Sequence, residues 1–206
     1  MSETRKRNIL ILAEGNEEKP YIDKILSFPN INKEVYNFAQ AINVKGNGKI
    51  FARYQYEFQK GYYDLILVFC DGDNNSSQFL SFLNSFGEYF FKNKKDSLEV
   101  FIYSNPVTLQ IILSHFGEVK LKNVGKKTNA KIVEQLTGIK NYSAKTEQID
   151  QLINKINYNS LDLFKNNLSK ISNNIKDIPS TNFLMFLNKF ESSDTSWINE
   201  ILKKFK

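Results

Sequence analysis

The sequence is poor in cysteine, in arginine and in long apolar runs, and each shortage excludes a class of protein. Among 206 residues there is a single cysteine, Cys70, so no disulfide can form within the chain and the reducing cytoplasm is the expected compartment. No apolar stretch approaches the roughly 18 to 20 residues that a membrane-spanning helix requires, so we expect no membrane segment. Basic residues precede the apolar run at residues 8–13, but that run is too short for a signal peptide and ends in acidic residues.

Arginine is also scarce, because only Arg5, Arg7 and Arg53 occur among 28 basic residues. The net charge of +6 has the sign that suits a polyanionic partner. The lysines are scattered along the chain, however, so two interpretations stay open: a face that binds nucleic acid, and a generally solvated lysine surface. The hydrophobic content of 41% and the length predict a folded chain of one domain, or of one domain with an extension.

Apolar and polar blocks alternate in a pattern typical of an α/β protein. The expected strands lie at residues 8–13, 36–44, 64–70 and 98–103. The expected helices lie at residues 17–26, 50–60, 76–91 and 107–116. Strand–helix alternation predicts a mostly parallel, four-stranded sheet flanked by helices, with right-handed crossovers. After Gly117 the periodicity is mostly helical, so we expect residues 1–118 to form one domain and residues 119–206 to form a mostly helical C-terminal extension packed on it.

Two of the expected strands end abruptly in carboxylates and glycine. Residues 8–13 lead into Glu14-Gly15, and residues 64–70 lead into Asp71-Gly72-Asp73. Uninterrupted apolar runs indicate strands buried on both faces of a parallel sheet, and ligands of such sheets bind beyond the carboxyl ends of the strands. Three carboxylates meeting there would repel one another unless a cation lay between them. The alternative is that each turn is an ordinary solvated loop.

These carboxylates predict a Mg²⁺ site, or a Mn²⁺ site, that acts on phosphodiesters. Mg²⁺ prefers oxygen ligands and is held by one or two carboxylates together with water and phosphate oxygens. A metal bound to Glu14, Asp71 and Asp73 would polarise a phosphoryl oxygen and lower the pKa of a water molecule.

Three basic residues are further candidates for this chemistry. His115, the only histidine, is a candidate general base or phosphate contact; the alternative is a packed side chain or helix cap. Lys126 and Lys127 lie in a basic stretch and are candidates for stabilising developing phosphoryl charge; the alternative is a solvated loop.

The motifs resemble those of the TOPRIM domain. More narrowly, the chain resembles the RloB-like proteins of anti-phage and abortive-infection systems, and more distantly the nuclease half of the OLD family. The resemblance rests on Glu14-Gly15-Asn16-Glu17-Glu18, Asp71-Gly72-Asp73, Ser104-Asn105-Pro106, His115-Phe116 and Pro179-Ser180-Thr181-Asn182. It is good over residues 8–116 and loose beyond them. The chain departs from the family at Glu17, where threonine is frequent, and at residues 107–111, which lack the expected acidic or aromatic residue.

This resemblance implies a Rossmann-like TOPRIM domain and a metal-dependent nuclease of bacterial defence. By it, Glu14, Asp71 and Asp73 are metal ligands and Glu18 is an auxiliary acid. The substrate is DNA or RNA, with tRNA included. Because the chain contains no ATPase motif and such systems pair TOPRIM with an ATPase, a separate ATPase partner is expected. The rival interpretations are a non-catalytic metal-binding subunit or toxin, and a nucleotidyl or phosphoryl transferase.

Overall fold

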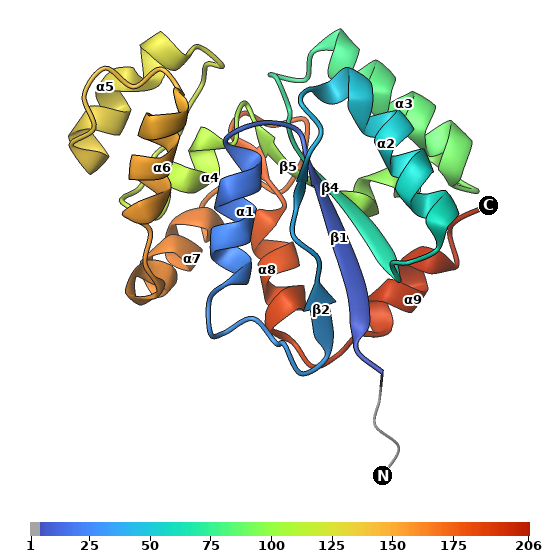
Figure 1. Ribbon diagram of the computed structural model, residues 1–206. Helices are drawn as coiled ribbons and strands as arrows, with labels where there is room; N and C mark the ends of the chain where they lie inside the picture. Colours follow the sequence, from blue (N-terminus) through green and yellow to red (C-terminus); the bar gives the residue numbers. More distant parts are fainter. Residues whose placement is uncertain (1–4) are drawn as a thin grey trace.

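A computed structural model describes residues 5–206 as helices packed on both faces of a mixed, mostly parallel sheet (Figure 1). Within this part of the chain the sheet has six strands: β1 (Arg7–Ala13), β2 (Tyr36–Phe38), β3 (Ile42–Asn43), β4 (Leu65–Asp71), β5 (Phe101–Asn105) and β6 (Ser180–Thr181). The strand order is β2-β1-β4-β5-β6, with β3 also paired to β1. β6 runs antiparallel to β5, and the other pairings are parallel. The α/β fold class is therefore confirmed.

The two central strands are the two apolar runs of the sequence. β1 and β4 pair in parallel register from Ile9 opposite Leu65 to Ala13 opposite Phe69. All ten of these paired positions are buried, as expected for strands covered by helices on both faces. Because the register is fixed, Glu14 and Asp71 follow at the same end of the sheet.

Helices cover the two faces of the sheet (Figure 1). On one face lie α1 (Glu18–Leu26) and α8 (Phe183–Glu191). On the other lie α2 (Asn47–Lys60), α3 (Ser77–Phe90) and α9 (Ser196–Leu202). In α3, Phe79, Leu83, Phe86 and Phe90 recur at helical spacing and are buried, so the amphipathic helix expected at residues 76–91 is confirmed. The short α4 (Leu109–Leu113) follows β5.

The sheet differs from the expected four strands in three places. The strand expected at 36–44 is divided into β2 and β3, and between them the Ala41 N–H donates to Asp23 Oδ1 over 3.1 Å. The strand expected at 98–103 begins later, because residues Lys94–Val100 form a 3₁₀ helix, η1. The third difference is β6, which comes from the segment expected to be helical.

β6 could not be predicted from the alternation of polar and apolar residues, because it has only two residues. The Asn182 side chain extends its pairing with β5, since Oδ1 accepts from the Tyr103 N–H at 2.9 Å and Nδ2 donates to the Phe101 carbonyl at 2.7 Å. The Thr181 hydroxyl adds a bond of 2.6 Å to the Tyr103 carbonyl. Side chains thus continue the pairing beyond the two-residue backbone ladder, and side-chain pairing has no period of two to detect.

The rest of the C-terminal half is largely helical, as predicted. It contains α5 (Lys126–Thr137), α6 (Thr146–Asn154), the 3₁₀ turn η2 (Tyr158–Ser160) and α7 (Leu161–Ser169). Val133 of α5, Leu152 of α6 and Phe164 of α7 belong to the same apolar cluster as the sheet. We call residues 119–156, which include α5 and α6, the cap; Figure 1 shows both helices on the same side of the sheet as α1. A domain boundary at residue 118 stays a prediction.

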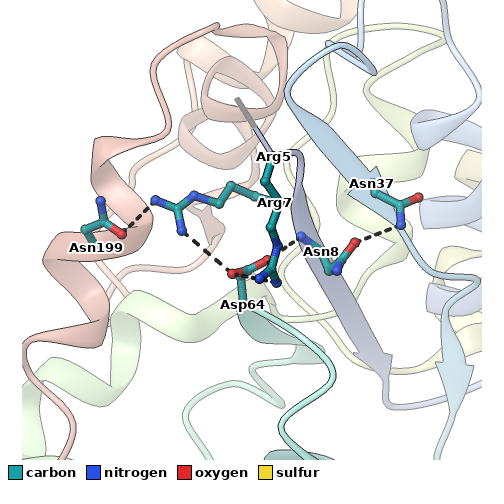
Figure 2. Close-up of polar contacts among 6 residues, drawn as sticks. All are labelled: Arg5, Arg7, Asn8, Asn37, Asp64 and Asn199. Carbon is teal, nitrogen blue, oxygen red and sulfur yellow. Dashed lines mark hydrogen bonds and ion pairs between the residues drawn. The ribbon is translucent and has the colours of Figure 1, made fainter. Parts of the chain in front are cut away.

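The amino end of the sheet is closed by a polar cluster (Figure 2). Asp64 accepts the Asn8 N–H at 2.8 Å and forms ion pairs with Arg5 at 3.3 Å and Arg7 at 3.7 Å. Arg7 also donates to Asn199 of α9 over 2.9 Å. Two of the three arginines therefore tie down the end of the sheet opposite Glu14 and Asp71. Among the described residues, no helix combines the length and the apolar character that crossing a bilayer demands.

Candidate functional site

A cavity of about 680 Å³ lies at the carboxyl ends of β1 and β4. Its lining includes five carboxylate side chains, which come from the β1–α1 and β4–α3 turns and the start of α1: Glu14, Glu17, Glu18, Asp71 and Asp73. Part of the lining comes from the cap, through Val124, Asn129, Ala144 and Ile149. The structure therefore brings together Glu14, Glu18, Asp71 and Asp73, which the sequence places as far as 59 residues apart.

Glu14 links the ends of the two central strands. Its backbone N–H donates to the Phe69 carbonyl at 2.9 Å, which continues the β1–β4 ladder by one residue. Its side-chain Oε2 accepts the Asp71 N–H at 3.0 Å. One carboxylate oxygen of Glu14 is thus held by the protein, and this contact fixes the spacing between Glu14 and Asp71.

Asp71 is oriented by Thr108, which precedes α4. The Thr108 N–H and hydroxyl both donate to Asp71 Oδ1, over 2.5 Å and 2.7 Å. Thr108 is fully buried. Because both donors approach one oxygen, the Asp71 carboxylate is held in a single orientation.

Asp73 is placed by a turn that only short polar residues adopt readily. Asp73, Asn74 and Asn75 have φ values of 47°, 55° and 57°, in the left-handed region that aspartate and asparagine tolerate. Gly72 packs against Asn105, since an added Cβ would lie 2.8 Å from the Asn105 Cβ. The absence of a side chain at Gly72 thus lets the Asn105 side chain approach the turn closely.

Four carboxyl groups of the cavity, those of Glu14, Glu18, Asp71 and Asp73, have raised pKa values, and burial is the largest cause in each case. Burial raises the pKa of Glu14 to about 7, and the charges of Glu18 and Asp73 add to this effect. Burial also raises the pKa of Glu18 to about 7, with the Glu17 charge contributing. Burial and the Glu18 charge raise the pKa of Asp71 well above its ordinary value. None of the ion pairs found among the described side chains includes a cavity carboxylate, and Lys45, a basic residue in the lining, is exposed and forms no ion pair with them.

The donor chemistry suits a divalent cation, although the cavity holds no finished cage. All five acidic groups offer oxygen, which Mg²⁺ and Mn²⁺ prefer, and Mg²⁺ needs only one or two carboxylates. Across residues 5–206, no group of three or more His, Cys, Asp or Glu side chains is arranged to hold a metal ion. The cavity oxygens therefore suit a divalent cation by their chemistry. A complete set of ligands would also need side-chain movement, water or substrate oxygens.

The structure does not bring His115 to the cavity. His115 is 2% exposed, its Nε2 lies 3.0 Å from the Tyr21 hydroxyl, and its ring stacks on Phe164 with centroids 3.7 Å apart. Burial lowers its pKa to about 3, so the ring stays neutral at ordinary pH. His115 therefore has the alternative arrangement considered from the sequence, that of a packed side chain.

Of the two candidate lysines, Lys127 is not among the residues that line the cavity. Lys127 is an exposed residue in the first turn of α5, and the side chain of Lys126 lies outside the described part of the structure. Their expected role next to a reacting phosphate stays a prediction.

Three site residues had no role in the sequence analysis. Thr108 orients Asp71, and the Tyr142 hydroxyl donates to Glu17 Oε1. Glu17 appeared there only as a departure from a family motif. Its proximity to Glu18 was the one available signal, since Tyr142 is 125 residues away in the chain.

No protein-family model, curated protein or solved structure matches this chain.

Proposed function

We propose that this chain is a Mg²⁺-dependent nuclease built on a Rossmann-like TOPRIM domain. The observation that carries the proposal is the set of buried carboxylates from two neighbouring strand ends in one cavity, none of which forms an ion pair with a described side chain. Buried carboxylates without a positive partner cost free energy, and a bound divalent cation removes that cost. Shifted pKa values in a cavity are also typical of functional sites.

In this proposal three of the cavity acids bind the metal and a fourth exchanges a proton. Asp71, Asp73 and Glu14 would hold the metal through oxygens that accept no hydrogen bond from the described residues, since Thr108 occupies Asp71 Oδ1 and the Asp71 N–H occupies Glu14 Oε2. The metal would supply polarisation of the phosphoryl oxygen and activation of a water. Glu18, with a pKa of about 7, is suited to exchanging a proton near neutral pH.

The biological setting is proposed from the motif resemblance alone. It comprises cytoplasmic bacterial defence against phage or abortive infection, a DNA or RNA substrate, with tRNA included, and control by a separate ATPase. The basic net charge of +6 agrees with a polyanionic substrate.

The test is cleavage of end-labelled DNA and RNA by the purified protein with Mg²⁺ or Mn²⁺. We expect Asp71→Asn and Glu14→Gln to reduce cleavage by at least about 100-fold, a loss at the upper end of that seen when groups around a metal are removed. Glu134→Gln, an exposed acid outside the cavity, is the matched control. Unchanged cleavage by the cavity variants, with thermal melting showing an intact fold, would overturn the proposal.

A second candidate is a non-catalytic metal-binding subunit or toxin. It is favoured by the lack of a preformed cage among residues 5–206 and by the protein donors already bound to Asp71 and Glu14. Calorimetry with Mn²⁺ alongside the cleavage assay separates the two, because this candidate binds metal and cleaves nothing. Incorporation of a labelled nucleoside triphosphate would instead indicate a nucleotidyl transferase.

A further inference from the structure

The positive charge of the chain is concentrated in the cap. Residues 119–156 contain eight lysines and three acidic residues, a net charge of +5 against +6 for the whole chain. The remainder of the protein is therefore almost neutral. A scattered, generally solvated lysine surface would spread this charge over the molecule in proportion to length.

The lysines of the cap are also unpaired. Of its eight lysines, the structure describes seven side chains; all seven are exposed and none lies in an ion pair. They are Lys120, Lys122, Lys127, Lys131, Lys140, Lys145 and Lys155. Outside the cap, six of the seventeen lysines form ion pairs with carboxylates, among them Lys19, Lys165 and Lys204. The unpaired cap lysines remain available to an external anion.

The same segment forms part of the wall of the carboxylate cavity. Two residues that line the cavity alternate with cap lysines in the chain. Val124 lies between Lys122 and Lys127, and Asn129 lies between Lys127 and Lys131. Lys127 and Lys131 are four residues apart in α5, so they lie on one face of that helix. A basic surface thus borders an acidic cavity, and a polyanion held by the first would place one of its groups beside the second.

We infer that the cap is the docking surface for the phosphate backbone of a nucleic acid. The inference rests on the proposed function in choosing a nucleic acid over other polyanions. An anionic membrane is disfavoured by the structure, because Val124 is the only large apolar side chain exposed among the described residues of the cap. Helices that bind membrane surfaces present a continuous apolar face beside their basic one.

Binding is measured in EDTA, where metal-dependent cleavage is absent, with labelled single- and double-stranded DNA and RNA. The test variant is Lys122→Gln/Lys127→Gln/Lys131→Gln. The matched control is Lys6→Gln/Lys95→Gln/Lys203→Gln, three exposed lysines of the body that form no ion pair in the described structure. We expect the cap variant to bind about 100-fold more weakly at 0.1 M salt. The slope of log K against log salt should fall by about 2 to 3, as loss of three phosphate contacts requires.

Four outcomes overturn the inference: no binding of nucleic acid by the wild type, normal binding by the cap variant, equal weakening in the two triple variants, or tighter binding to phosphatidylserine vesicles than to nucleic acid. Cleavage in Mg²⁺ is scored separately. If the cap variant alone loses binding but the wild type cleaves nothing, the nuclease proposal fails and the docking surface stands. If Asp71→Asn abolishes cleavage while the cap variant binds normally, the reverse holds.

Discussion

Thr108 donates two hydrogen bonds to a single oxygen of Asp71, one from its backbone N–H and one from its hydroxyl. The other oxygen, Oδ2, accepts no hydrogen bond from the residues that the structure describes. A carboxylate fixed in this way presents one defined ligand position, which is the role that partners of metal ligands commonly serve.

Removing the Thr108 hydroxyl is expected to weaken metal binding. Thr108→Val keeps the shape and the N–H but loses the 2.7 Å bond, so Mn²⁺ affinity should fall about 10- to 100-fold. Thr108→Ser retains the hydroxyl and should bind Mn²⁺ nearly as the wild type does. Isothermal calorimetry measures both, and equal affinities for the valine and serine variants would rule out this positioning role.

Gly72 is expected to tolerate no side chain. In Gly72→Ala the new Cβ would lie 2.8 Å from the Asn105 Cβ, and relieving that overlap should destabilise the fold by about 1 to 3 kcal/mol. Gly48→Ala is the control, because a Cβ there meets nothing within 4 Å and the position lies in α2. Urea unfolding measures both, and the control should be neutral or slightly stabilised. Equal stability of the two variants would show that the β4–α3 turn moves freely.

The metal-free protein is expected to lose stability as the pH rises from about 4.5 to about 7. The folded pKa values of Glu14 and Glu18 are about 7 and the ordinary glutamate pKa is 4.5, so the folded state binds the proton more tightly. Their contribution is fully present below pH 4.5 and is lost through pH 7, by at most about 3 kcal/mol for each group. Thermal melting at pH 5 and pH 8 checks this.

Two comparisons make that measurement specific to the cavity. Glu14→Gln should flatten the pH dependence, and saturating Mg²⁺ should raise the melting temperature more at pH 8 than at pH 5, because protons compete with the metal for carboxylates. A Mg²⁺ effect that is equal at both pH values would place the ion elsewhere on the molecule.

His115 is expected to act on stability rather than on cleavage. Its folded pKa of about 3 lies below the ordinary histidine pKa of 6.5, so its contribution to stability is present above pH 6.5 and is lost as the pH falls toward 3. His115→Phe preserves a ring against Phe164, and should reduce acid sensitivity in melting experiments while leaving cleavage intact. A large loss of cleavage in a folded His115→Phe protein would return this residue to the catalytic set.

The central strands and the acidic cavity could be predicted because their signals are local. Continuous apolar runs define β1 and β4, and their parallel register carries Glu14 and Asp71 to one end. The Asp71-Gly72-Asp73 sequence likewise predicts a turn. For each of these elements, the residues that cause it to form lie within about ten positions of one another in the sequence.

The missed features depend on partners that are distant in the chain. The pairing of Asn182 with β5 crosses about 80 residues, and the bond between Tyr142 and Glu17 crosses 125. Thr108 stands where an acidic or aromatic residue was expected, and it acts as a donor to Asp71 instead of as a ligand. A threonine gives no sign of this role until the fold shows which carboxylate it meets.

The segment just before β6 supports the acidic turn at Gly72, although the ribosome makes that segment much later than the turn. Asn105, against which Gly72 packs, donates through Nδ2 to the carbonyls of Ile175 and Asp177, just before β6. The ribosome synthesises Ile175 and Asp177 some seventy residues after Asn105. A translation product truncated before residue 175 would leave the outer edge of β5 open and Asn105 unanchored, so premature termination should yield chains whose acidic turn is unformed.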